Sequence, residues 1–164
     1  MSIVVSCVFP GSFDPPTKGH LNLISRASAM FDHVTVTVMH NIHKSGTIPV
    51  SKRLEMLRTA CREFDNVSIE SWDGLLADYM KQKKETIILR GIRGAEELDR
   101  ELQSAAANRL LNKHMETVFL PSDPGMTGIS STAVREIAAF EGDISPFVPP
   151  ELTEEISQLL SKQD

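Results

Sequence analysis

Two stretches of this 164-residue chain combine glycine, hydroxyl and basic residues in the manner of phosphate-binding sites. The first, at 11–20, reads GSFDPPTKGH, and an apolar helical pattern begins directly after it at Leu21. We therefore expect a helix to start near Thr17. With Thr17 as the N-cap residue, His20 takes the third helical position, beside free backbone N–H groups and the positive end of the helix dipole. Such a helix start suits a phosphate.

The second stretch is 129–135, with the sequence ISSTAVR. Its hydroxyl cluster precedes another apolar helical face, so Ser130, Ser131 and Thr132 are expected at a helix start, where they would supply donors to further phosphates. Taken alone, such a cluster is more often an ordinary helix cap. The two stretches together favour a ligand that carries several phosphates.

Three basic residues follow strand-like apolar runs and are candidate phosphate ligands. Arg90 and Arg93 come after the run that ends at Leu89, and an arginine can hold a phosphate with two parallel hydrogen bonds. Lys44 follows the run that ends at Met39. A loop lysine is usually only solvated, so the case for Lys44 depends on its place at the same edge of the sheet.

The elements that must position these residues are short strands alternating with helices. Apolar, β-branched runs occur at 3–9, 34–39, 67–69, 86–89 and 117–120. Helical spacing between the later runs predicts an α/β fold: one doubly wound, mostly parallel five-stranded sheet in a single domain over 1–164. Ligands of such sheets bind beyond the carboxyl ends of the strands, so the loops with the unusual residues should converge on one crevice.

Three apolar stripes at helical spacing are expected to face the core. They are formed by Leu54, Leu57, Cys61 and Phe64, by Leu98, Leu102, Ala106 and Leu110, and by Leu152, Ile156, Leu159 and Leu160. Cys7 and Cys61 lie far apart in apolar runs without a CxxC pair. This predicts two buried free thiols in a protein of a reducing compartment.

Composition argues against several classes of protein. Asp and Glu number 22 against 17 Lys and Arg, a net charge of -5, which is unlike a protein that coats nucleic acid. No apolar run approaches the roughly 18 residues of a membrane span, and the N-terminal stretch lacks the basic start of a signal peptide. We therefore expect a cytoplasmic protein that binds neither nucleic acid nor membrane. We find no carboxylate cluster spaced to hold a metal on the protein alone.

Both glycine and hydroxyl stretches also match known signatures. The stretch at 11–20 resembles the nucleotidylyltransferase superfamily motif G-[ST]-F-D-P-x-[TH]-x-G-H, and every fixed position is met. The stretch at 129–135 resembles the second motif of that superfamily, I-S-S-[ST]-x-[VI]-[RK]. The resemblance implies a Rossmann-like fold whose two motifs clamp a nucleotide triphosphate.

Within the superfamily, the whole chain is most similar to the bacterial phosphopantetheine adenylyltransferases. Thr17 stands where many relatives have a first histidine, and 90–93 with Glu101 and 108–109 resembles the R-G-[LI]-R…E…N-R segment of that family. The stretches 116–120 and 142–149 resemble its C-terminal part. Two departures are notable: Ser12 replaces the usual threonine, and Met126 stands where Trp or Tyr often lies beside the adenine.

The resemblance implies transfer of the adenylyl group of ATP to 4′-phosphopantetheine, giving 3′-dephospho-coenzyme A and pyrophosphate. It gives catalytic roles to His20, Lys44 and Arg93. It gives ATP contacts to Ser12, Phe13, His20, Gly91, Ile92, Arg93, Glu101, Met126, Thr127, Gly128, Ile129, Ser130, Ser131 and Thr132. It gives acceptor contacts to Ser12, Lys44, Leu76 and Arg90. Mg²⁺ should arrive with ATP, coenzyme A is the expected feedback inhibitor, and a homohexamer, as a dimer of trimers, is the expected assembly.

Two alternatives remain open at this stage. One is an adenylyltransferase or cytidylyltransferase for another phosphate acceptor, such as nicotinamide mononucleotide. The other is a non-catalytic nucleotide-binding module with the same fold. The retained His20 and Lys44 favour an enzyme, since a silent module would be free to lose either.

Overall fold

The five apolar runs form five parallel strands of one sheet in the order β3-β2-β1-β4-β5. The computed structural model describes residues 4–40 and 46–161. The strands are β1 (Ser6–Gly11), β2 (His33–His40), β3 (Val67–Asp73), β4 (Ile87–Ile92) and β5 (Glu116–Pro121). The helices are α1 (Lys18–Met30), α2 (Val50–Ala60), α3 (Leu76–Lys83), α4 (Ala95–Leu111), α5 (Ser131–Ala139) and α6 (Thr153–Ser161). The predicted doubly wound α/β fold is confirmed, and the pairing between the described strands is wholly parallel.

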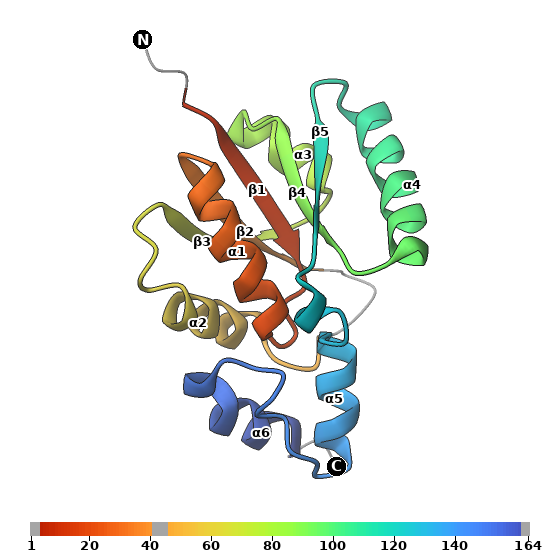
Figure 1. The fold of residues 1–164 in the computed structure, drawn as a ribbon. Helices are drawn as coiled ribbons and strands as arrows, with labels where there is room; N and C mark the ends of the chain where they lie inside the picture. Colours follow the sequence, from red (N-terminus) through yellow and green to blue (C-terminus); the bar gives the residue numbers. More distant parts are fainter. Residues whose placement is uncertain (1–3, 41–45, 162–164) are drawn as a thin grey trace.

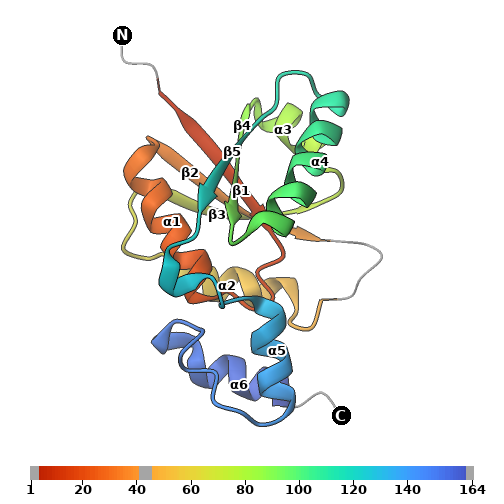
Figure 2. The same cartoon turned by 45° about the vertical axis from the view of Figure 1, so that its right-hand side comes forward.

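The sheet has helices on both faces, as alternation along its strands requires. Cys7 and Phe9 of β1 face the layer of α1 and α2, where they pack with Ile24 and Leu57. Val8, between them, faces the other way, into a cluster with side chains of α3. Figures 1 and 2 show α1 and α2 on one side of the sheet and α3 and α4 on the other.

A third apolar cluster joins the C-terminal helices to the rest of the molecule. Ile48 and Met56, before and within α2, pack with Val134 of α5 and Ile156 of α6. Figure 1 shows α5 and α6 beyond the end of the sheet toward which the arrowhead of β1 points. This arrangement brings the start of α5 to the edge of the sheet where β1 ends.

Of the three predicted core stripes, the first and the last are confirmed and the middle one is wrong. Leu57, Cys61, Ile156 and Leu160 are buried. In α4, by contrast, no residue is buried, and Leu110 is 90% exposed. The reason is position: α4 packs on β4 and β5 at one margin of the sheet, where little covers its outer side.

Two smaller predictions concern the thiols and the membrane. Cys7 and Cys61 are both buried and unbridged, as expected. Burial raises the pKa of the Cys7 thiol to about 12 and that of the Cys61 thiol to about 11, so both stay protonated and unreactive at neutral pH. No helix within 4–40 and 46–161 is long and apolar enough to cross a bilayer.

Candidate active site

The turn between β1 and α1 has the geometry predicted for a phosphate-binding helix start. Thr17 is the N-cap residue and His20 the third helical residue: Thr17 Oγ1 accepts a hydrogen bond from the backbone N–H of His20, and His20 Nδ1 accepts one from the backbone N–H of Thr17 at 3.0 Å. A nitrogen that accepts a backbone N–H carries no proton. The neutral ring of His20 therefore has its proton on Nε2.

The charge of His20 is suppressed by its surroundings. Burial lowers the pKa of His20 to about 4, and the positive charges of Arg93 and Arg90 contribute in the same direction. At neutral pH the ring is thus an uncharged Nε2–H donor. The ring of Phe13 packs against it at 4.8 Å between centroids, and Phe13 itself holds a left-handed backbone with φ of 47°.

Buried ionic contacts hold the 12–14 segment of this turn in place. The carboxylate of Asp14 accepts hydrogen bonds from the backbone N–H groups of Thr47 at 2.7 Å and Ile48 at 2.8 Å. The guanidinium of Arg53, only 3% exposed, donates to the backbone carbonyl of Ser12 at 2.7 Å and lies close enough to Asp14 for the two charges to attract. Arg135 of α5 donates to the carbonyl of Asp14. The donor-rich loop is therefore a fixed element.

A first cavity of about 280 Å³ opens where this turn meets α5 and the end of β4. Most predicted ATP-binding residues line it: Ser12, Phe13, His20, Gly91, Arg93, Met126, Ile129, Ser130, Ser131 and Thr132. Ser130 is the N-cap residue of α5, and its hydroxyl accepts from the backbone N–H of Ala133 at 3.1 Å, as the sequence predicted. The remaining predicted ATP contacts, Ile92, Glu101, Thr127 and Gly128, do not line this cavity.

A second cavity, of about 690 Å³, lies on the other side of the β1 end. Three residues predicted for the acceptor, Ser12, Leu76 and Arg90, line it together with Glu101. Its other walls are largely apolar and come from the end of β2, from β4 and β5, from residues 74–76 at the start of α3, and from α4. Lys44, the other predicted acceptor contact, lies outside the described residues.

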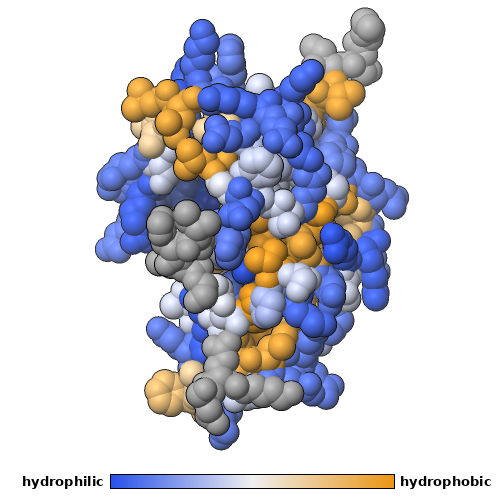
Figure 3. Space-filling view, turned by 180° about the vertical axis from the view of Figure 1, so that it is seen from behind, coloured by the Kyte–Doolittle hydropathy of each residue, from blue (hydrophilic) through white to orange (hydrophobic). Residues whose placement is uncertain are grey.

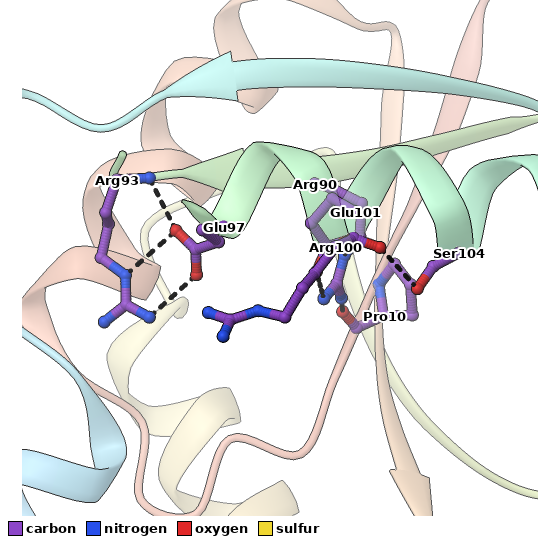
Figure 4. A network of polar contacts seen from close by, with 7 residues as sticks. All are labelled: Pro10, Arg90, Arg93, Glu97, Arg100, Glu101 and Ser104. Carbon is purple, nitrogen blue, oxygen red and sulfur yellow. Dashed lines mark hydrogen bonds and ion pairs between the residues drawn. The ribbon is translucent and has the colours of Figure 1, made fainter. Parts of the chain in front are cut away.

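The two cavities share one wall, formed by Pro10, Gly11, Ser12 and Arg90. Arg90 is fixed there: its Nε and Nη2 donate to the Glu101 carboxylate at 2.8 and 2.6 Å, and its Nη1 donates to the carbonyl of Pro10 at 2.7 Å. Figure 4 shows these contacts beside a second pair, Arg93 with Glu97. A cation and a hydroxyl thus stand between two spaces, which suits a reaction that joins two phosphate-bearing molecules.

Three residues that shape this site have no predicted role. Arg53 and Glu97 contact predicted site residues but lie in neither predicted motif, and Arg135, the last residue of the second motif, was given no role of its own. Glu97 had a usable signal, because a carboxylate four residues after an arginine at a helix start can reach back to it. Arg53 had none, since its partners on Ser12 and Asp14 are far away in the chain.

Comparison with known proteins agrees with this geometry. Residues 8–137 match the model of the cytidylyltransferase-like family. A phosphopantetheine adenylyltransferase of Clostridium perfringens is 40% identical over 154 residues, covering 94% of both chains. One of Streptomyces coelicolor is 41% identical, covering 93% of this chain and 96% of its own. Among solved structures, the nicotinic acid mononucleotide adenylyltransferase of Plasmodium falciparum, complexed with NaAD, superposes with a TM-score of 0.71 over 95% of this chain and 96% of its own at 17% identity, which supports the fold alone.

Proposed function

We infer that this chain, which belongs to the phosphopantetheine adenylyltransferase family within the cytidylyltransferase-like family, transfers the adenylyl group of ATP to 4′-phosphopantetheine. The products are 3′-dephospho-coenzyme A and pyrophosphate. The observation that carries the proposal is the pair of cavities that meet at Ser12 and Arg90. One is lined by phosphate-binding helix starts, and the other has the apolar walls that a pantetheine arm needs.

The two substrates occupy the two cavities. The triphosphate of ATP lies in the first cavity, against the helix starts of α1 and α5 and the guanidinium of Arg93. Met126 lies beside the nucleotide and contributes apolar contact in place of an aromatic ring. The pantetheine arm lies along Leu76 in the second cavity, with its phosphate at the shared wall between Ser12 and Arg90. The two reacting phosphates therefore meet at that wall.

The chemistry needs positioning more than proton transfer. An oxygen of the acceptor phosphate attacks the α-phosphorus, the bond from that phosphorus to the bridging oxygen breaks, and pyrophosphate leaves with the electron pair. A phosphate monoester is already anionic at neutral pH, so no general base is required. The Nε2–H of His20 donates to the α-phosphate, while Arg93 and Lys44 stabilise the negative charge that develops.

Magnesium is expected to enter with ATP. Among the described residues that line the first cavity, Glu97 supplies the only carboxylate, and Arg93 engages it. No group of three or more metal-binding side chains occurs within 4–40 and 46–161. These residues do not form a set of protein ligands for Mg²⁺, and an ion that entered with ATP would neutralise part of the charge of its phosphates.

The exposed apolar residues of α4 support assembly of the chain into the expected homohexamer. Leu102 is 50% exposed, Leu110 90% and Leu111 52%. Exposure of several large apolar side chains to water is unfavourable, and such surfaces often mark protein–protein contacts. Seen from behind, hydrophobic residues gather at the corner of the molecule that α4 occupies (Figure 3). Light scattering after gel filtration should give six times the chain mass of 18.2 kDa, and a monomer would contradict the proposal.

Feedback and location complete the proposal. Coenzyme A shares the pantetheine arm and the nucleotide with the product, so it can occupy both cavities and compete with both substrates. Two buried free thiols suit a reducing compartment, which supports a cytoplasmic enzyme.

The proposed function is tested by pyrophosphate release with Mg²⁺ and a panel of acceptors. ATP is paired with 4′-phosphopantetheine or nicotinamide mononucleotide, and CTP with glycerol 3-phosphate. We expect turnover with 4′-phosphopantetheine alone. Turnover with another acceptor would contradict the proposed substrate. No turnover with any acceptor would contradict the proposal that the chain is an enzyme.

A further inference from the structure

The guanidinium of Arg93 is held by a single carboxylate one helical turn away. Glu97 Oε2 accepts from the backbone N–H of Arg93 at 2.7 Å and from its Nε at 3.3 Å, and Glu97 Oε1 accepts from Nη2 at 2.8 Å. Figure 4 shows these contacts at the start of α4. Burial alone would raise the pKa of Glu97, but the hydrogen bonds and charge of Arg93 outweigh it and lower that pKa. The pair is therefore ionised at neutral pH.

These contacts leave Nη1 of Arg93 directed away from Glu97, and it donates to the carbonyl of Ile129 at 3.1 Å. Ile129 immediately precedes the hydroxyl residues that start α5. Arg93 thus links the end of β4 to the second phosphate-binding segment. Both Arg93 and Glu97 line the first cavity, which is the space assigned above to the nucleotide.

We propose that Glu97 is a positioning residue for adenylyl transfer, which acts by fixing the guanidinium of Arg93 against the phosphates. The inference rests on the proposed function. An exposed arginine has several rotatable bonds, and ordering it during the reaction would cost free energy at the barrier. Contacts from Glu97 to both the backbone and the guanidinium of Arg93 remove that freedom before the substrate arrives.

The negative charge of Glu97 lies in a cavity that we assign to a triphosphate. A negative charge in a cavity for a triphosphate repels the ligand and weakens binding of ATP. Glu97 must therefore contribute more to the transition state than to ground-state binding. Its loss should lower kcat without raising the KM for ATP, whereas damage to a purely structural contact of the pocket would raise that KM.

The test compares Glu97→Ala with Glu96→Ala, a matched control in the same first turn of α4. Glu96 makes no polar side-chain contact with any residue in 4–40 or 46–161. Because a small misplacement of a reacting group can cost up to about 100-fold, we expect Glu97→Ala to lower kcat about 10-fold. The KM for ATP should change less than about threefold, and Glu96→Ala should match the wild type. Circular dichroism confirms folding of each variant.

A double-mutant cycle separates positioning from structure. If Glu97 acts through Arg93, adding Glu97→Ala to Arg93→Ala lowers kcat no further. Equal losses in both backgrounds, an unchanged kcat in the single variant, or a raised KM for ATP with unchanged kcat would each overturn the inference. These failures are distinct from failure of the proposed function, in which the wild type itself would not turn over 4′-phosphopantetheine.

Discussion

The two cavities that flank the end of β1 differ in the way that their proposed ligands differ. The first is the smaller, about 280 Å³, and is lined by two helix starts, by Arg90, Arg93 and Arg135, and by the uncharged ring of His20. The second, about 690 Å³, has a mainly apolar surface, to which Met39, Leu76 and Ile88 contribute. Polar donors recognise phosphate, and apolar walls recognise a flexible organic arm. In the proposed reaction, the end of β1 would thus separate two kinds of recognition and bring the two reacting phosphates together.

The largest loss of activity is expected from His20, which lines the first cavity and not the second. Loss of one preorganised donor to a charge that develops in the transition state commonly costs about 100-fold to 1000-fold in rate, so His20→Ala should lower kcat by at least that order. Steady-state kinetics of the folded variant measures this. His114→Ala, at an exposed histidine, is the control and should be silent. Near-normal turnover of His20→Ala would contradict the role of the Nε2–H donor.

The next largest loss is expected from Arg90, which lines both cavities. Arg90 donates three hydrogen bonds, two to the carboxylate of Glu101 and one to the carbonyl of Pro10, in a fork that a lysine cannot reproduce. We expect Arg90→Ala to lower kcat/KM about 100-fold for both substrates, and Arg90→Lys to recover little of it.

The matched control for Arg90 is Arg58→Lys, at an exposed position of α2. This control should behave like the wild type. A loss confined to one substrate, or full rescue by Arg90→Lys, would show that the wall is not shared in the way described.

A pH effect on stability should arise from the first cavity. The pKa of His20 falls from its ordinary 6.5 to about 4 in the folded chain, so the unfolded chain binds the proton more readily. Titration of His20 therefore leaves the free energy of unfolding unchanged above pH 6.5. As the pH falls toward 4, it lowers that free energy by roughly 2 to 3 kcal/mol.

Urea unfolding at pH 7 and pH 4.5 measures this loss. The free energy of unfolding of the wild type should fall relative to that of His20→Ala, which lacks the titrating ring. The same drop in both chains would contradict a buried neutral His20.

How far the sequence predicted this molecule depends on the range of the interactions involved. The five strands were found because strands covered on both faces are continuous apolar runs. The cap of α1 was found because Thr17 and His20 interact across one turn. The two motifs together indicated most of the residues that line the first cavity.

What the sequence did not predict needed partners that are distant along the chain. The apolar stripe of α4 predicted a covered face, but periodicity does not say what covers a helix, and Leu110 lies exposed at the margin of the sheet. Arg53 reads as an ordinary helix residue until the fold brings Ser12 and Asp14 to it. The separate placement of Glu101 in the second cavity likewise depends on how α4 lies against β4.

The assignment of ATP to the first cavity and of 4′-phosphopantetheine to the second is tested most directly by truncating one apolar side chain in each cavity. Leu76 lines only the second cavity and Met126 only the first. Because each truncation removes about 1 kcal/mol of apolar contact, we expect Leu76→Ala to raise the KM for 4′-phosphopantetheine about fivefold and Met126→Ala to raise the KM for ATP about fivefold. Each variant should leave the other KM within about twofold. The assignment of one substrate to each cavity is wrong if both truncations raise the KM for the same substrate. It is also wrong if each truncation raises the KM for ATP and the KM for 4′-phosphopantetheine by the same factor.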